Sequence, residues 1–497
     1  MNLSAPPRPV PAPVPSLVDA QARKPRSRLT GDARWVWASL ALVAVAAIVG
    51  PILQHGGSQL FVNAAPLLGD RKPHLGIGSP FAIAFAVAAV ALFPRLVRRV
   101  RWRPLLLIGW LAAIGWTVSL ALIDGWQRGW VDRLTNSNEY LHDLPRIGSI
   151  SGFLSTFASD IKDFQPGSWT THVAGHPPAA TLVFLLLDRV GLSGGAWAGV
   201  VVVGVGTLAA VAVPITLRGL GAPRAARSVL PFTVFFPGAV WVGVSADGLF
   251  AGVAATGLAM TLVGVLSRRR FAGSAAVFGG LLLGLTVYLS YGLVLLIVIV
   301  AAACLCSAGV LATRGGWLRP WLIGWSLVTV GVLAVIALFS AAGFSWFQGL
   351  AELQVRYYQG IASLRPYSYF VWANLAALVL SAGPVAAAGL ARAVTVLRHP
   401  AGGRLAGSRL RVRQQGSWWA DRAEMLVPAT IAVAALLAVL IADLSGLSKA
   451  ETERIWLPFG FFLVCGLALL PRRAGRWAIA VQVGCALVVN HLVLTQW

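Results

Sequence analysis

The chain has 497 residues, of which 57% are hydrophobic and only 11% are charged. Soluble domains carry about 25% charged residues, whereas this chain has repeated apolar runs of roughly 20 residues, the length that crosses a bilayer. The composition therefore excludes a water-soluble enzyme and predicts an all-α fold, a polytopic transmembrane helical bundle.

The net charge is +23, from 40 Lys and Arg against 17 Asp and Glu. In a soluble protein this excess would suggest a nucleic-acid partner. Here the basic residues form short clusters between apolar runs, which is the pattern that fixes orientation in a membrane. We therefore expect the lipid bilayer, and no nucleic acid, among the partners.

Residues 1–34 are Pro-rich and basic and contain no apolar stretch near the start. This composition predicts a disordered cytoplasmic tail and does not fit a cleavable signal peptide. The first transmembrane segment is expected directly after it.

Thirteen apolar segments are candidates for transmembrane spans. They are residues 35–54, 80–97, 104–123, 195–217, 228–244, 248–266, 273–289, 291–311, 320–342, 369–391, 426–443, 455–471 and 477–494. The predicted organisation follows in chain order: N-terminal spans (35–123), an outer catalytic loop with a short apolar segment (124–192), a central bundle (195–344), a second outer loop (345–368) and C-terminal spans (369–497) with a cytoplasmic loop (393–424).

Residues 177–192 are apolar but short, and they open with two prolines. A full crossing here would reverse every later loop and would place Arg268, Arg269 and Arg270 outside. We therefore expect this segment to dip into the membrane or to pack against the bundle without crossing.

The charges then divide between the two sides of the membrane. With the tail inside, 29 of the 40 Lys and Arg lie on the inner side and 11 on the outer side, which predicts a multi-pass protein of the plasma (inner) membrane with a cytoplasmic N-terminus. The acidic residues divide the other way, 13 of 17 outside. Because membrane insertion does not explain this concentration, we expect the chemistry to face outward.

The first outer loop, about 50 residues long, has apolar residues at helical spacing and should fold as short amphipathic helices at the membrane surface. Among its six acids, Asp124 directly follows the apolar run ending at Ile123, where a partly desolvated carboxylate is well placed to act as a base. Glu139 and Asp143 are four residues apart, a spacing that suits two carboxylates at one site, although most such pairs are simply solvated.

His172 and His176 are also four residues apart, which could place two imidazoles on one metal ion if the segment were helical. Gly175 lies between them and two prolines follow, so a continuous helix is not expected. Hydrogen bonding to an anionic group is the alternative role. The chain has no HExxH, CxxC or P-loop motif, and its four cysteines all lie inside apolar runs.

Several short motifs together resemble a known family. A carboxylate after an early span is followed by Glu139 and Tyr140, by GHPPA (Gly175–Ala179), by SADG (Ser245–Gly248) and by TERIWLPF (Thr452–Phe459). This combination resembles the polyprenyl-phosphate-sugar-dependent glycosyltransferases of the GT-C superfold, including actinobacterial members. The resemblance covers roughly residues 104–300 and, more weakly, 345–460.

The sequence departs from the family pattern in two ways. Two spans precede the one that leads into the loop, and no adjacent Asp-Glu pair follows that span. The identity of the catalytic acid therefore stays open between Asp124 and Glu139, with Asp132 and Asp143 as further candidates.

The resemblance implies transfer of a hexosyl or pentosyl group from a polyprenyl-phosphate donor to a cell-envelope glycan or glycolipid. A loop carboxylate would act as general base, and cations or hydrogen-bond donors would stabilise the leaving phosphate. The substrate-binding candidates are His172, His176, Asp247, Arg356, Arg365, Glu453 and Arg454. Participation of a divalent cation, Mg²⁺ or Mn²⁺, stays open.

A lipid or polysaccharide transporter, or flippase, is the main alternative, and a non-catalytic scaffold of an envelope assembly is a third. Transporters usually show internal repeats and charged or interrupted helices near the membrane midplane. No convincing repeat is present here, and the acids concentrate in loops and at helix ends, which favours the enzyme.

Overall fold

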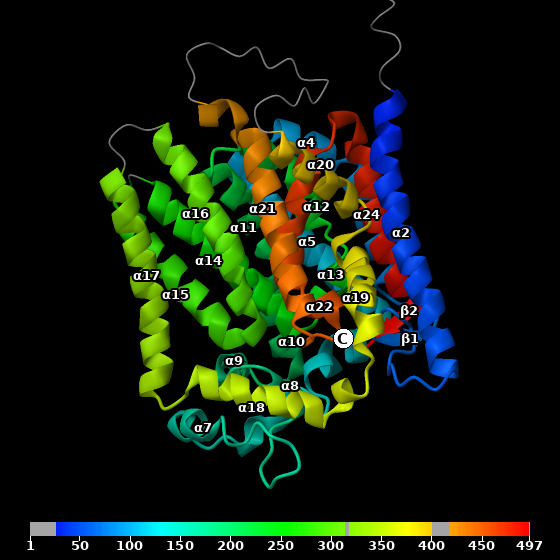
Figure 1. Cartoon of the computed structure of the whole chain (residues 1–497), viewed down its shortest axis with the longest axis vertical. Coiled ribbons are helices and arrows are strands. Elements are labelled where there is room, and N and C mark those ends of the chain that lie inside the picture. Colours follow the sequence, from blue (N-terminus) through cyan, green and yellow to red (C-terminus); the bar gives the residue numbers. More distant parts are fainter. Residues whose placement is uncertain (1–25, 268, 314–317, 400–417, 497) are drawn as a thin grey trace, which may run out of the picture.

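A computed structural model describes residues 26–267, 269–313, 318–399 and 418–496. Within them the chain forms a bundle of upright helices with short helices at one end and almost no sheet (Figure 1). This confirms the predicted all-α polytopic bundle. The predicted tail, up to residue 25, and the middle of the predicted cytoplasmic loop, 400–417, lie outside the described residues.

The first half of the chain contains α2 (Arg26–His55), β1 (Gly69–Arg71), α3 (Ser79–Ala91), α4 (Phe93–Arg99), α5 (Trp102–Ala121), η1 (Leu122–Asp124), η2 (Gln127–Val131), η3 (Asp132–Leu134), α6 (Tyr140–Asp143), η4 (Leu144–Arg146), α7 (Ile150–Thr156), α8 (Thr171–Gly175), α9 (Pro178–Arg189), α10 (Gly195–Gly206), α11 (Ala209–Gly219), α12 (Pro223–Val234) and α13 (Ala239–Val242). The outer loop predicted after residue 123 is therefore a series of short helices, as expected.

The second half contains α14 (Ala246–Leu266), α15 (Ala272–Leu289), η5 (Tyr291–Leu295), α16 (Leu296–Ala312), α17 (Leu318–Ala341), α18 (Trp346–Gln359), η6 (Ile361–Ser363), α19 (Tyr367–Ala382), α20 (Ala386–Arg398), α21 (Trp418–Leu444), α22 (Thr452–Ile455), α23 (Leu457–Leu463), η7 (Val464–Leu469), η8 (Arg472–Ala474), α24 (Gly475–Leu492) and β2 (Val493–Thr495). The two strands pair antiparallel, with Gly69 opposite Thr495.

Among the described residues, eight helices are long and apolar enough to cross a membrane, or up to eleven if each of three bent helix pairs counts as one span. The thirteen expected segments exceed this count of candidate spans at two places. The segment 228–244 is divided into α12 and α13 around Pro237 and Gly238, and the last two expected spans form one of the bent pairs. The short helix α9, which was not expected to cross, is absent from the candidate spans.

Helix α14 lies at the centre of the bundle and is the most buried of the candidate spans. It packs against α10, α11, α15 and α23. Small residues allow this close approach: a side chain at Gly264 would clash with the backbone of Ala276 on α15. Because α14 is held on several sides, the acidic residue in its first turn, Asp247, has a fixed position.

The two ends of the bundle differ in character. One end, at the top of Figure 1, carries α4 and α20, which end in arginines. The opposite end carries α7, α8 and α18, which lie across the bundle axis, with α22 and the two strands just inside (Figure 1). We call this second end the site end, because the acidic and histidine candidates gather there.

Candidate active site

The centre of the candidate site is the guanidinium of Arg454 on α22. Its Nη1 donates to Asp247 Oδ2 at 2.5 Å, and its Nη2 donates to Glu451 Oε2 at 2.5 Å and to His172 Nε2 at 2.8 Å. The Arg454 side chain is 6% exposed and that of Asp247 4%. The candidates His172 and Asp247, which are far from Arg454 in the sequence, and the nearby Glu451 therefore meet at one fixed cation.

The local backbone explains how Glu451 reaches this arginine. Ala450 and Glu451 both have left-handed φ angles, 72° and 63°, which residues with a side chain adopt only when surrounding contacts hold them there. Asn374 on α19 supplies such contacts: its Nδ2 donates to the Ser448 carbonyl at 2.7 Å and its Oδ1 accepts from the Ala450 amide at 3.2 Å. The bend places Glu451 directly before α22 and three residues from Arg454.

Glu139 approaches the same group from α6, where it is the N-cap residue. Its Oε1 lies 3.2 Å from His172 Nδ1, which also faces the Asn138 carbonyl at 2.9 Å. Since Nδ1 faces two acceptors and Nε2 accepts from Arg454, the hydrogen-bond network assigns the His172 proton to Nδ1. His172 thus connects the carboxyl of Glu139 to the guanidinium of Arg454. We call Arg454, Asp247, Glu451, His172 and Glu139 the Arg454 cluster.

Burial separates the two glutamates of this cluster in their protonation. It raises the pKa of Glu139 to about 8, an effect that Arg454 only partly offsets. Burial also acts to raise the pKa of Glu451, but the attraction of Arg454 and Arg365 outweighs it and holds that pKa below its usual value. Burial and the nearby Arg454 lower the pKa of His172 to about 3, so the imidazole is neutral. Glu451 is therefore a permanent anion, whereas Glu139 titrates near neutral pH.

A second layer of contacts lies behind the histidine. The Tyr140 hydroxyl is 2.9 Å from His176 Nδ1, which also faces the His172 carbonyl at 2.9 Å. Burial lowers the pKa of His176. His176 therefore supports His172 from behind and has no direct contact with Arg454 among the hydrogen bonds of the described residues.

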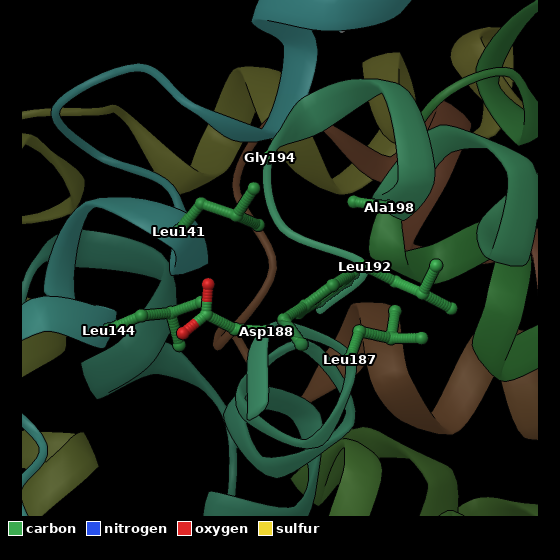
Figure 2. A pocket seen from close by; sticks show the side chains of 8 residues that line it. Leu141, Leu144, Leu187, Asp188, Leu192, Gly194 and Ala198 are labelled. Carbon is green, nitrogen blue, oxygen red and sulfur yellow. The ribbon is translucent and has the colours of Figure 1, made fainter. Parts of the chain in front are cut away.

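Tyr140 also links the cluster to a small apolar pocket. Its ring packs against Phe184 of α9, with centroids 5.3 Å apart, and Phe184 lines the pocket together with leucines of α6, η4 and α9. Figure 2 shows the Asp188 carboxylate among Leu141, Leu144, Leu187 and Leu192. The pocket lies between α6 and α9 and does not include a member of the Arg454 cluster.

Asp124, a candidate base, lies in a different cluster. Its Oδ1 is 2.8 Å from His74 Nε2 and its Oδ2 accepts from Arg133 Nη2 at 2.5 Å. Arg133 and Arg128 also donate to the carbonyl of Thr495 on β2. One oxygen of Asp124 therefore pairs with Arg133, which ties the loop to the C-terminal strand, and the other oxygen faces the His74 imidazole. We call Asp124, His74, Arg133 and Thr495 the Asp124 brace.

Asp143 and Arg356 also lie apart from the Arg454 cluster. Although Glu139 and Asp143 flank the same helical turn, Asp143 pairs with Arg146 at 3.1 Å and accepts from the Thr170 amide at 2.8 Å. The two carboxyl groups thus have separate partners, and neither is solvated. This differs from both alternatives that their spacing suggested, two carboxylates at one site and a solvated pair. Arg356 on α18 pairs with Asp163 at 2.7 Å and so fastens α18 to the loop before α8.

Glu453 and Arg365 border the cluster. Glu453 is fully buried; its Oε1 accepts from the Leu68 amide at 3.0 Å, whereas its Oε2 has no hydrogen-bond partner. Burial raises the pKa of Glu453 to about 7. Among the ion pairs of the described residues, Arg454 pairs with Glu451 and not with Glu453. Arg365 lies on the other side of Glu451, with Nη1 3.7 Å from Glu451 Oε1.

The sequence-based candidates did not include Glu451, Asn374, Lys449, His74 or Arg133. The spacing of three between Glu451 and Arg454 within one helical turn was a usable signal. The others act through contacts between distant segments. Among the described residues, no group of three or more His, Cys, Asp or Glu is arranged to hold a metal ion.

No protein-family model matches this chain, and no curated protein sequence matches it. Among solved structures, it is similar to the oligosaccharyltransferase of Archaeoglobus fulgidus in the apo form (TM-score 0.39, 16% identity, 78% of this chain and 56% of that one). It is also similar to that enzyme tethered to an acceptor peptide containing the NVT sequon (TM-score 0.39, 13% identity, 78% and 54%).

A third similar structure is the Archaeoglobus fulgidus enzyme in complex with an inhibitory peptide and a dolichol-phosphate (TM-score 0.32, 18% identity, 77% of this chain and 49% of that one). The chain spans about half the length of these matched structures. At such TM-scores the likeness carries neither a site nor an activity over to this chain.

Proposed function

We propose that this protein is a membrane glycosyltransferase of the GT-C type that transfers a sugar from a polyprenyl-phosphate donor to a hydroxyl of a cell-envelope glycan or glycolipid. The observation that carries the proposal is the Arg454 cluster: a buried guanidinium fixed by Asp247 and Glu451, one imidazole away from a carboxyl group, Glu139, whose pKa lies near neutral. A fixed cation beside a titratable carboxyl group suits displacement of a phosphate by an alcohol.

In the proposed reaction, the acceptor hydroxyl oxygen forms a bond to the anomeric carbon, and the bond from that carbon to the donor phosphate oxygen breaks. The phosphate leaves with the bonding electron pair, and its charge is stabilised by Arg454. The hydroxyl proton passes to ionised Glu139, a general-base step worth roughly 10²- to 10⁴-fold in rate. His172 contacts both groups and so fixes the carboxyl group of Glu139 relative to the guanidinium of Arg454.

Glu139 is chosen over Asp124 because of their partners. Asp124 accepts from Arg133 and faces His74, so a proton placed on it would weaken its ion pair with Arg133. Glu139 has a raised pKa and faces only one ring nitrogen among the ion pairs of the described residues. Glu139, which can take up and release a proton near neutral pH, is therefore the better base.

The proposed orientation follows the charge distribution: the site end faces outward from the plasma membrane, and the arginine-rich end faces the cytoplasm. The donor would then reach the cluster from the outer leaflet. Accessibility labelling of a single cysteine introduced at Phe164, which is 83% exposed on the α7–α8 loop, is expected to succeed from the outer side.

The direct test is sugar transfer from a radiolabelled polyprenyl-phosphate sugar in membranes that contain wild-type protein or the Glu139→Gln variant, with and without added Mg²⁺ or Mn²⁺. We expect transfer by the wild type and a loss of roughly 10²- to 10⁴-fold in Glu139→Gln. The matched control is Glu352→Gln on α18, which removes an ion pair with Lys162. Wild-type transfer by Glu139→Gln would refute the base assignment.

The transporter alternative is less well supported by the position of the charges. Transporter sites are usually built near the membrane midplane from interrupted helices, whereas the Arg454 cluster is built from α6, α8, α22 and the first turn of α14 at the site end.

A further inference from the structure

Arg365 has an unusual set of partners for a buried arginine. It is 5% exposed. Its Nε donates to the Leu60 carbonyl at 3.1 Å and its Nη1 to the Lys449 carbonyl at 2.8 Å, while its Nη2 is buried and has no hydrogen-bond partner. The nearest carboxylate, Glu451, is 3.7 Å away and gives its other oxygen to Arg454. A buried guanidinium held mainly by neutral carbonyls, with one nitrogen unpaired, is poised to accept an anion.

A second cation lies beside it. Lys449 donates from Nζ to the Ala362 carbonyl at 2.9 Å, and the same Nζ lies 5.6 Å from the ring centroid of Tyr358. Its backbone is fixed as well, because its amide donates to the Tyr357 hydroxyl at 3.0 Å. Among the ion pairs of the described residues, none joins Lys449 to a carboxylate.

The balance of charge at this edge of the site is positive. Two further carboxyl groups, Glu139 and Glu453, have pKa values raised to about 8 and about 7 by burial, so they contribute little negative charge below those values. The charged groups around Glu451 are then three cations and two carboxylates, with a net charge of +1: Arg365, Lys449, Arg454, Asp247 and Glu451. A further carboxyl group, Asp443, accepts from the Asn374 amide at 2.8 Å behind them. An anion of charge −1 would balance the first five groups.

The surroundings of this pair are apolar and exposed. Leu437, Ile441 and Leu444 share one face of α21 by their spacing, and all three are exposed along the span. That face ends beside the cations: the Tyr367 hydroxyl, two residues after Arg365, donates to the Leu444 carbonyl at 3.4 Å. Leu364, adjacent to Arg365 in sequence, and Ile361, four residues before it, are also exposed.

We propose that Arg365 and Lys449 form a phosphate subsite at the edge of the bundle, which receives a polyprenyl monophosphate sideways from the membrane with its chain along the exposed face of α21. The subsite borders Glu451 on the side opposite Arg454, so a phosphate there would occupy an entry position next to the place beside Arg454 where the phosphate leaves in the proposed reaction. This assignment rests on the proposed function for its choice of a lipid monophosphate as the ligand.

Direct binding tests the subsite without requiring catalysis. The purified full chain in lipid nanodiscs is titrated with a long-chain polyprenyl monophosphate, with the corresponding polyprenyl alcohol and with inorganic phosphate. We expect the monophosphate to bind at least about tenfold more tightly than the alcohol, because hydrogen bonds to charged groups are strong. Equal binding of monophosphate and alcohol overturns the subsite, and inorganic phosphate that competes fully at similar concentration overturns the lipid assignment.

Variants then locate the binding. Arg365→Gln is expected to weaken monophosphate binding by roughly 10- to 100-fold, Arg365→Lys less, and Lys449→Gln by a few-fold. Arg71→Gln is the matched control, because Arg71 is an exposed arginine at the same end that donates to a backbone carbonyl, that of Ala47. If Arg365→Lys and Lys449→Gln, as folded variants, both bind like wild type, the proposal is wrong.

The same variants separate this proposal from the proposed function. Lost monophosphate binding in Arg365→Gln, together with no sugar transfer by the wild type, would leave the subsite standing and overturn the transferase. Sugar transfer by Arg365→Gln with an unchanged KM for the donor would overturn the subsite and leave the transferase standing. If both proposals hold, KM for the donor rises by roughly 10-fold or more while kcat changes much less.

Discussion

The Asp124 brace and the Arg454 cluster are both buried charge networks at the site end, but they differ in what could be added to them. In the brace, one oxygen of Asp124 accepts from Arg133 and the other faces His74, and Arg133 also donates to the backbone of β2 although its Nε is buried without a hydrogen-bond partner. In the Arg454 cluster, Glu139 has a raised pKa and reaches the arginine only through His172. The comparison teaches that a carboxylate paired directly with an arginine holds segments together, whereas a carboxyl group separated from the cation by an imidazole can take up a proton.

Removing the central cation is expected to have the largest effect. Arg454→Gln leaves Asp247 buried without its partner and leaves the partly exposed Glu451 with Arg365 alone, so the free energy of unfolding should fall by about 3–5 kcal/mol, and sugar transfer should be lost. Thermal unfolding of the purified protein and radiolabelled transfer in membranes measure the two effects.

A double variant separates stability from chemistry. In Arg454→Gln with Asp247→Asn, one of the stranded charges is neutralised, so part of the stability should return while transfer stays lost. Recovery of transfer in the double variant would show that Arg454 serves only to neutralise Asp247.

The sharpest test of the comparison pairs Glu139→Gln with Asp124→Asn. Both changes replace a carboxylate by the amide of the same shape. Glu139→Gln should lower transfer by roughly 10²- to 10⁴-fold with little loss of stability, since the carboxyl group is protonated below a pKa of about 8. Asp124→Asn should do the reverse and lower stability by about 3 kcal/mol or more, because Arg133 loses its buried partner.

The two variants are compared by transfer per folded molecule and by melting temperature. A stable Asp124→Asn protein without activity, together with an active Glu139→Gln protein, would exchange the roles assigned to the two clusters.

The pH dependence of Glu139 should act on activity and stability in opposite directions. Activity needs the ionised carboxylate, so kcat/KM should rise with pH and level off above about 8. Stability should fall over the same interval: the unfolded carboxyl loses its proton near 4.5, whereas the folded one keeps it to about 8, so the folded state binds more protons between these values.

Glu139→Gln should remove the contribution of Glu139 over the whole interval from about 4.5 to about 8, so the slope should become smaller below about 7, where Glu453 still contributes, and should be lost between about 7 and 8. Melting curves over this pH range, for wild type and variant, measure the difference. An unchanged slope in the variant would assign the titration to another group.

Asn374 should matter less, because it acts through Glu451. Asn374→Ala removes its hydrogen bonds to Ser448 and Ala450, which should lower stability by about 1–3 kcal/mol and allow Glu451 to move away from Arg454. A positioning role predicts a higher KM for the donor as well, and partial rescue by Asn374→Gln. Lower stability with unchanged kinetics would limit Asn374 to a structural role.

The sequence predicts those parts of the fold and the site that depend on residues close together in the chain, and it does not predict contacts between distant segments. Hydropathy runs predict spans because each run is local, and they failed where Pro237 and Gly238 interrupt a helix without interrupting the apolar pattern. The candidates His172, Asp247 and Arg454 could be chosen from short motifs near predicted helix ends.

Their pairing could not be derived in the same way. The partners of Asp124 are His74, fifty residues earlier, and Arg133. Arg133 in turn contacts Thr495, which lies in the strand pair. Such contacts leave no periodic signal in one sequence, so sequence alone kept both acids open as candidate bases.

The smallest expected effect concerns the left-handed bend before α22. Ala450 has φ of 72°, a conformation that costs a residue with a Cβ about 1–2 kcal/mol and that glycine adopts freely. Ala450→Gly removes this strain but gives the unfolded chain more freedom, which offsets roughly 0.4–1 kcal/mol. The variant should therefore be equally stable or more stable by up to about 1 kcal/mol, and its transfer rate should change little because the contacts of Asn374 still fix the bend. A large loss of transfer without loss of stability would mean that the strain at Ala450 itself, rather than the hydrogen bonds around it, holds Glu451 against Arg454.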